Sequence, residues 1–335
     1  MVSPSPSERG QGVRSVSESN MDVKGKTTGF ISKQPFFLIL VIFSIGVVAS
    51  ILNPNFLTQS NMFAILQQIA VLGIVTMSMV LLLISGLIDL SVGGMIGLAT
   101  VTITKSVMAG MPLELALLIG IALCLGCGLL NGVIVSKSKC VPLIVTLGMS
   151  YVYAGLALVI SQGVFLSLKT DFDFLGRGKI FGIPVSVIIL LVVISGTHLL
   201  LKFTTYGRRI VALGGNEEVA FLAGIQVDRY KMINYTLSGG LIALASLVLL
   251  SRLGSVLATV GNGYELRALA AAVIGGVTFE GGRGTVFGAF LGVILLGLVA
   301  NAMNILNVSS YYQTVVLGVI IVSAVVVSNL GKIKG

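Results

Sequence analysis

Long apolar stretches, separated by short polar turns, fill most of the sequence. A helix needs about 20 apolar residues to cross the roughly 30 Å hydrocarbon core of a bilayer, because each residue adds about 1.5 Å. Eight stretches come close to this length: residues 36–52, 64–85, 113–134, 141–161, 183–201, 233–252, 285–306 and 311–328. The pattern predicts an all-α, polytopic membrane protein.

Two further apolar segments are weaker. Residues 92–109 are interrupted by Gly, Thr and Lys105, and residues 266–279 are too short to cross the bilayer fully. With both included, the sequence predicts about ten transmembrane or re-entrant helices. The weak segments are third from the start and third from the end, and short Gly-interrupted segments at corresponding positions often mark a substrate path in transporters. This symmetry suggests two five-helix halves, although no residue-level repeat supports them.

Composition agrees with the membrane prediction. The 335 residues are 56% hydrophobic and 10% charged, against about 25% charged residues in soluble domains. This deficit excludes a soluble globular protein, a disordered chain and a nucleic-acid-binding protein. Glycines four residues apart (Gly284, Gly288 and Gly292, then Gly93 and Gly97) predict close helix contacts. The alternative is that these glycines have no specific partner.

The positive charges indicate the topology. Of the 21 Lys and Arg residues, 15 fall in segments that this topology places inside and 6 fall outside or near the outer helix ends. Basic residues concentrate in cytoplasmic loops, so both termini are expected in the cytoplasm. Residues 1–33 are polar, lack the apolar core of a signal peptide and are expected to form a disordered cytoplasmic tail. Residues 34–335 then form the transmembrane domain.

The only long inside loop, residues 202–232, carries five basic and three acidic residues. After the Gly214–Gly215 pair, where we expect a turn, Asn216 is placed to cap a short amphipathic helix with Glu217 and Glu218 in its first turn. Gly224 would end this helix. The alternative is a solvated connector that binds no partner.

The sequence contains no nucleotide-binding loop, no HExxH or GxSxG motif and no Cys/His spacing typical of a metal site. We therefore expect no enzyme activity, metal or cofactor in this chain. Any ATP and Mg²⁺ would bind to a partner subunit.

A few polar residues in the apolar region are candidates for the substrate path or its gate. Asp89 and Ser91 lie where the second segment meets the Gly-rich third. Asp89 either caps the third segment by accepting the backbone N–H of Ser91 or Val92, or pairs with a basic residue such as Arg283 in one state. Asn301 and Asn304 share a helical face and either line the path, with the third and eighth segments, or bond between helices.

Four segments in the same order resemble the permease subunits of bacterial monosaccharide ABC importers of the ribose type. The segments are LISGLIDLSVGGMIGLAT, GRRIVALGGNEEVAFLAGIQVDRYKM, GYELRALAAAVIGGVTFEGGRGTVFGAFLG and NAMNILNVSSYYQ. The resemblance covers the chain from about residue 50 to its end.

The resemblance implies a permease in the bacterial cytoplasmic (inner) membrane that pairs with a second copy or a paralogue. Its other partners would be a tandem ATP-binding subunit, a periplasmic or lipid-anchored sugar-binding protein and the lipid bilayer. The family's coupling pattern Glu-x-Ala-x-x-x-Gly corresponds to Glu218, Ala220 and Gly224, but the Ile-x-Leu-Pro tail of many other importers is missing. The ATPase-coupling candidates are Gly215, Asn216, Glu217, Glu218, Ala220, Phe221 and Gly224.

The expected function is therefore translocation of a ribose-like monosaccharide driven by ATP hydrolysis in a partner. The alternatives are the same machinery carrying a furanose-like quorum signal or another small ligand, a proton-coupled carrier, and a membrane scaffold or receptor. The sparse charge of the spans and the single docking loop favour the importer.

Overall fold

The structure is a computed structural model that describes residues 35–168 and 172–333. These residues form thirteen helices: Pro35–Leu52, α2 (Gln59–Ile84), α3 (Val92–Met108), α4 (Leu113–Ser138), α5 (Pro142–Ser161), α6 (Phe174–Arg177), α7 (Val185–Phe203), α8 (Thr205–Gly215), α9 (Glu217–Leu222), α10 (Val227–Leu253), α11 (Tyr264–Ile274), α12 (Val286–Ile305) and α13 (Ser310–Ile333). The tail predicted at residues 1–33 lies outside the described residues.

A helix occupies each of the ten predicted segments. Seven of the helices in the described part of the chain are long and apolar enough to cross a membrane: Pro35–Leu52, α2, α4, α5, α7, α10 and α12. The weak third segment is a regular helix of 17 residues, α3. The weak eighth segment, α11, has 11 residues and rises only about 16 Å, which is half of the hydrocarbon thickness.

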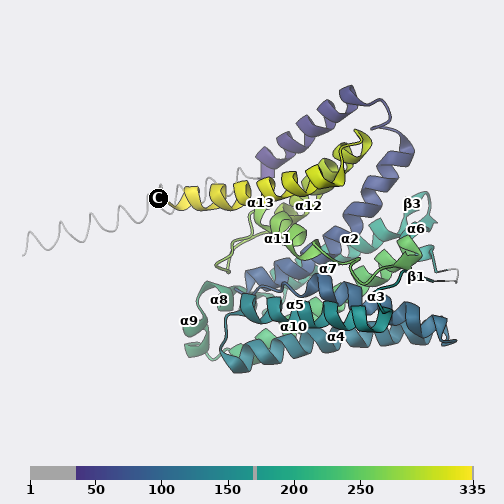
Figure 1. Ribbon diagram of the computed structural model, residues 1–335. Coiled ribbons are helices and arrows are strands. Elements are labelled where there is room, and N and C mark those ends of the chain that lie inside the picture. Colours follow the sequence, from purple (N-terminus) through teal and green to yellow (C-terminus); the bar gives the residue numbers. More distant parts are fainter. Residues whose placement is uncertain (1–34, 169–171, 334–335) are drawn as a thin grey trace, which may run out of the picture.

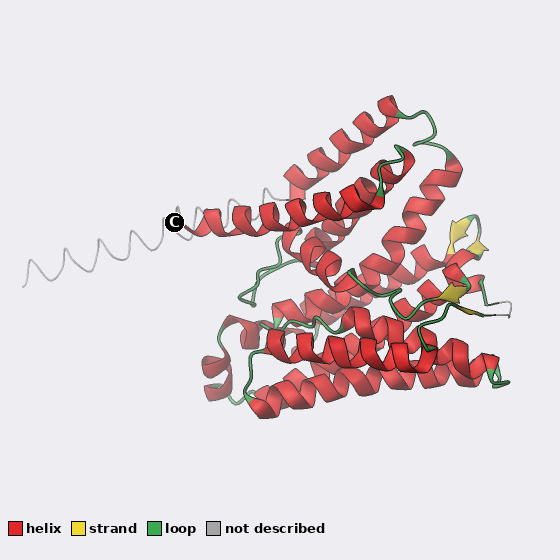
Figure 2. Ribbon diagram, viewed as in Figure 1, coloured by secondary structure: helices red, strands yellow, loops and turns green. Residues whose placement is uncertain are grey.

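Short strands depart from the all-α prediction. β1 (Leu166–Ser167) pairs with β4 (Ser255–Val256), and β2 (Lys179–Ile180) pairs with β3 (Ile183–Pro184), both antiparallel. Figure 2 shows these strands together at one end of the helical bundle. They fix the long loop between α5 and α7, because β1 pairs with a strand that follows α10 and β2 pairs with β3 within the loop.

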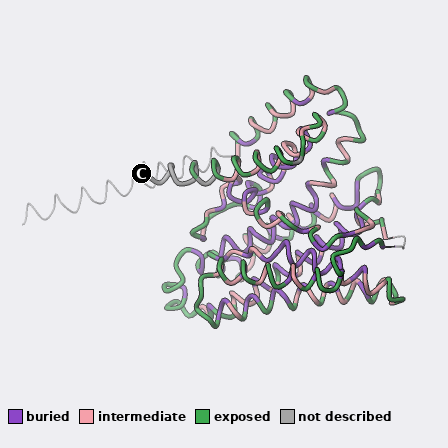
Figure 3. The backbone as a smooth tube through the Cα atoms, in the orientation of Figure 1, coloured by how far each residue is buried: buried purple, intermediate pink, exposed green. Residues whose placement is uncertain are grey.

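The bundle is built around α2 and α3. Both are buried along most of their length, whereas Pro35–Leu52, α4, α5 and α7 expose one side (Figure 3). α10 packs on α4 and α2, and α3 packs on α5 and α4. A helix that is buried on all sides does not contact lipid. The neighbouring helices therefore shield the weakly apolar α3 from the bilayer.

Glycine contacts bring several of these backbones together, as their spacing predicted. A Cβ at Gly97 would overlap the Ala258 carbonyl oxygen, and Cβ atoms at Gly288 and Gly292 would overlap carbonyl oxygens in and just after α11. Gly284 differs from the prediction, because it precedes α12 and has a φ of +146°. Close backbone approach is thus the reason for the glycine repeats in α3 and α12.

Figure 1 shows α8 and α9 at one end of the bundle and the short strands at the opposite end. α13 ends toward the α8–α9 side, and the turn between α12 and α13 lies on the strand side. The loop segment expected to contact a partner is therefore separated from the strands by the length of the bundle.

Candidate functional site

The predicted short helix in the inside loop is present as α9. The Asn216 side chain accepts a hydrogen bond from the backbone N–H of Val219 at 3.0 Å, and Glu217 and Glu218 occupy the first turn. Gly224 ends the helix with a φ of +81°, a backbone conformation that residues other than glycine rarely adopt. The cap and stop residues therefore lie where the sequence put them.

The loop contains a second helix, α8, where a Gly-Gly turn was expected. Thr204 caps it by accepting the backbone N–H of Gly207 at 3.0 Å, and both Gly214 and Gly215 lie in its last turn. The turn prediction was wrong: both glycines continue the helix, and Gly214 packs against the Ile84 carbonyl instead of reversing the chain. α10 also begins six residues earlier than the predicted span, so the loop is mostly helical.

α9 has a buried face and an exposed apolar face. Ala220 is buried in a small cluster with Leu213 and Val227. Val219, Phe221 and Leu222 are 60%, 68% and 77% exposed. Three apolar side chains exposed on six residues are not covered by the described part of this chain, and an exposed apolar patch commonly marks a contact surface.

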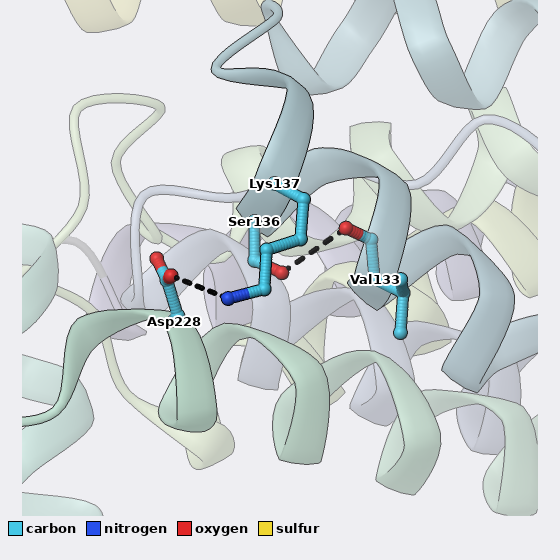
Figure 4. A network of polar contacts seen from close by, with 4 residues as sticks. All are labelled: Val133, Ser136, Lys137 and Asp228. Carbon is cyan, nitrogen blue, oxygen red and sulfur yellow. Dashed lines mark hydrogen bonds and ion pairs between the residues drawn. The ribbon is translucent and has the colours of Figure 1, made fainter.

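Electrostatic contacts hold α9 on α10. Lys231 Nζ lies 2.7 Å from Glu217 Oε1, and the Lys231 side chain is only 13% exposed. A second pair, Lys137 with Asp228 at 3.3 Å, joins α4 to α10 (Figure 4). Both partners of the second pair are more than half exposed, so that pair contributes at most about 1 kcal/mol.

These pairs line a cavity of about 680 Å³ beside α9, which also includes the exposed Cys140 and Lys139. Its walls come from the end of α2, the end of α4 and the starts of α5, α9 and α10. We call it the lysine pocket. Any movement of α9 would change its shape, because Glu217 is part of the wall.

Backbones of three distant segments meet beside α9 at a glycine junction, which consists of Gly86, Gly214, Gly281, Gly282 and the Ile84 carbonyl. The Gly282 N–H donates to the Ile84 carbonyl at 2.8 Å. A Cβ at Gly214 would overlap the same carbonyl oxygen, and a Cβ at Gly281 would lie 2.6 Å from the Gly214 oxygen. α8 therefore touches both the end of α2 and the loop before α12 with no side chain between them.

Hydrogen bonds give α8 a second connection to α2. The Tyr206 hydroxyl donates to the Asn234 side chain of α10 at 3.2 Å. Asn234 in turn donates to the Leu81 carbonyl at 2.9 Å and to Ser85 Oγ at 2.6 Å. Burial raises the pKa of Tyr206, so its hydroxyl keeps its proton and stays a donor.

Asp89 and Ser91 lie in the irregular segment between α2 and α3, and both are buried. Asp89 Oδ1 accepts the Ser91 backbone N–H at 2.8 Å and the Ser91 hydroxyl at 2.6 Å. The bond from the Ser91 N–H is the local contact that was expected, but it lies just before α3, and no side chain in the described part of the chain accepts an N–H of the first turn of this helix. The alternative pair with Arg283 is absent among the described ion pairs.

Residues that the sequence did not single out complete this cluster. Asn131 of α4 donates to Ser91 Oγ at 2.8 Å and contacts Asp89 Oδ2 at 3.4 Å. Tyr153 of α5 donates to the Asn131 side-chain oxygen at 2.9 Å. The sequence does show an Asn and a Tyr within apolar spans. Their contact with Asp89 and Ser91 could not be predicted, because these residues are far apart in the chain.

Asn301 and Asn304 have different environments. Asn301 is buried and exchanges two hydrogen bonds with Asn61 of α2, at 3.0 and 2.8 Å. Asn304 is exposed. Asn301 therefore bonds between helices, which was the alternative to lining the substrate path. α3, which was also expected to line the path, is buried in the bundle.

No group of three or more His, Cys, Asp or Glu residues that could hold a metal occurs in the described ranges. Cys124 and Cys127 are buried free thiols packed in the core. The candidate functional features are therefore the exposed apolar surface of α9, the glycine junction at the end of α8 and the buried polar clusters within the bundle.

Comparison with known proteins adds the family context. A family model described as "Branched-chain amino acid transport system / permease component" matches residues 61–325. The ribose import permease protein RbsC of Bacillus subtilis is 39% identical over 293 residues, which cover 87% of this chain and 91% of the relative. The ribose import permease protein RbsC of Escherichia coli K12 is 39% identical, covering 84% and 89%. The L-arabinose transport system permease protein AraH of the same strain is also 39% identical, covering 86% and 88%. No solved structure matches the chain.

Proposed function

Because this chain belongs to the family of branched-chain amino acid transport system permease components, we propose that it is the membrane subunit of a bacterial ATP-driven importer that translocates a monosaccharide. The observation that carries the proposal is 39% identity to ribose and arabinose permeases over more than four fifths of both chains. The family description refers to amino acids, but these relatives are named for sugars. The chain is thus a non-catalytic, multi-pass membrane protein.

ATP hydrolysis takes place in a partner subunit. The sequence has no nucleotide-binding loop, so this chain uses ATP energy only through a protein contact. α9 offers the surface for that contact, because Val219, Phe221 and Leu222 project from it and nothing in the described chain covers them. An ATPase with an apolar groove and a basic residue near Glu218 would complement this helix.

The glycine junction connects α9 to the transport helices. α8 lies between α9 and the end of α2, and the Tyr206–Asn234 bonds add a connection through α10. Packed backbones transmit displacement because no flexible side chain absorbs it. A shift of α9 on the ATPase would therefore move the end of α2 and the loop before α12 together.

The charge distribution supports the orientation that we propose. The basic inside segments include the α8–α9 loop, which lies at the end of the bundle toward which α13 runs (Figure 1). We place this end in the cytoplasm and the strand end outside, where a periplasmic or lipid-anchored binding protein would deliver the sugar. A second permease copy or paralogue completes the path.

Reconstitution tests the proposal. The permease, its ATPase and the binding protein are placed in vesicles, and uptake of radiolabelled ribose, arabinose and allose is measured. We expect uptake of at least one sugar that requires ATP and the binding protein and that persists when a proton ionophore is added. Uptake that stops with the ionophore while ATP hydrolysis continues would identify a proton-coupled carrier. The absence of flux for every sugar would contradict the sugar-importer proposal.

A further inference from the structure

A second cavity lies in the half of the bundle opposite α9. It has a volume of about 100 Å³, is partly open and is enclosed by α2, α11, α12 and α13. Most of its wall is apolar, but four polar side chains reach it: Gln68, Tyr264, Arg267 and Gln313. We call it the polar pocket.

The depth of these side chains makes the polar pocket unusual. Gln68 is the tenth residue of α2, about 14 Å from the helix start at 1.5 Å per residue. Arg267 lies in the first turns of α11 and is exposed on the isolated chain. Charged side chains at membrane depth face a protein or a water-filled cavity rather than lipid. The polar pocket therefore faces a second subunit or an aqueous path.

Two of the polar side chains, Gln68 and Arg267, form no hydrogen bond or ion pair within the described residues, although Arg267 lies close enough to Tyr264 to interact with it electrostatically. Gln313 donates from Nε2 to the Val308 carbonyl at 3.0 Å, which leaves its side-chain oxygen available. By contrast, Asn61 and Asn301, nearby on the same α2–α12 seam, satisfy each other. Polar side chains without such mutual bonds are available to a ligand.

The chemistry of the polar pocket fits a neutral polyol. Two carboxamides and a phenol both donate and accept hydrogen bonds, and a guanidinium donates in a fixed fork. No carboxylate lines the polar pocket, which disfavours a cationic ligand. The wall beside these groups is apolar at Leu296, Gly297 and Ala300, and it would face the C–H surface at the edge of a sugar ring.

We propose that the polar pocket between α2, α11, α12 and α13 is a transient binding site for the hydroxyl groups of a monosaccharide that enters from outside. This inference rests on the sugar-import function proposed above. A pocket of about 100 Å³ that is partly open holds only one edge of a monosaccharide. The contact is therefore weak, and the sugar leaves when the α2 and α11 walls move apart.

Transport kinetics with matched variants test the proposal. Gln68→Ala and Arg267→Gln each remove polar contacts of the polar pocket. Gln67→Ala is the control, because Gln67 is the neighbouring glutamine of α2 and is not part of the wall. In vesicles containing the ATPase and the binding protein, we expect the pocket variants to lower the maximal ribose uptake rate at least tenfold. The sugar concentration at half-maximal uptake, set by the binding protein, changes less than twofold.

Thiol labelling separates a sugar site from a structural role. Gln68→Cys should react with a membrane-impermeant methanethiosulfonate added outside, and 100 mM ribose should slow the reaction at least threefold. Gln67→Cys should show no ribose protection. Wild-type uptake together with unaffected pocket variants, or labelling of Gln68→Cys that ribose does not change, would overturn the site alone. No sugar uptake by the wild type would instead overturn the proposed function and the sugar assignment with it.

Discussion

Replacing Gly214 with alanine tests whether the glycine junction holds the loop of α8 and α9, which we propose to couple to the ATPase, on the transport helices. Gly214 lies in the last turn of α8, and an added Cβ would overlap the Ile84 carbonyl oxygen and lie 2.7 Å from the Gly282 nitrogen. Carbon atoms pack at about 3.5–4.0 Å. Both neighbours are backbone atoms, so they cannot rotate away from the new methyl group.

Two routes relieve this overlap. Either α8 moves away from the end of α2, or the loop before α12 moves and the 2.8 Å bond from the Gly282 N–H to the Ile84 carbonyl breaks. Overpacking costs about 1–3 kcal/mol, and the lost hydrogen bond costs about 0.5–1.5 kcal/mol. Alanine recovers at most about 1 kcal/mol of helix propensity. We expect a net destabilisation of about 1–3 kcal/mol.

Gly215→Ala is the matched control for stability, because a Cβ at Gly215 meets nothing within 4 Å. Thermal unfolding of the purified full-length permease should show a lower melting temperature for Gly214→Ala and no decrease for Gly215→Ala. In vesicles with the ATPase and the binding protein, Gly214→Ala should hydrolyse ATP but import sugar at less than a tenth of the wild-type rate. Wild-type melting and wild-type import by Gly214→Ala would refute the close contact and its role.

Substitutions at three further positions test the local structure. Gly224→Val places a β-branched residue at a φ of +81°, which should cost about 1–3 kcal/mol locally. This variant should insert into the membrane normally, as checked by fractionation, but its ATP hydrolysis should no longer drive uptake. Normal coupled uptake would contradict the role of α9. Asp89→Asn keeps an acceptor for Ser91 and should transport near the wild-type rate, whereas Asp89→Ala should lower the melting temperature; loss of transport in a well-folded Asn variant would favour gating. Asn301→Leu removes both bonds to Asn61, whose Nδ2 still donates to the Phe56 carbonyl while its Oδ1 loses its donor. The loss should cost about 1 kcal/mol and lower the melting temperature; unchanged melting would show that the pair contributes nothing.

Local signals were sufficient for much of the fold. The apolar stretches located the helices, because a span requires a continuous run of apolar residues. Asn216 and Gly224 located α9, because a cap and a left-handed stop depend on residues within one turn. The contact between Asp89 and Ser91 was likewise predictable, since the two are neighbours in the chain.

Contacts between distant segments were not predictable in this way. Gly214 looked like a turn residue because its packing partners, Ile84 and Gly282, lie 130 and 68 residues away in the sequence. The polar pocket has the same origin, because Gln68 and Arg267 meet only when α2 and α11 pack together. One polar residue in an apolar span has many explanations until its neighbours are known.

Two irregular segments within the bundle lie close to the same loop. One follows α2 and contains Asp89, and the other connects α11 to α12. These segments are far apart in the sequence. Gly86 lies in the first, Gly281 and Gly282 lie in the second, and all three pack against Gly214. Irregular backbone is tolerated inside a membrane protein where other helices shield it. Under the proposed function, a displacement of α8 would therefore act on both irregular segments at one point, whereas separate contacts would need two independent movements that stay synchronised.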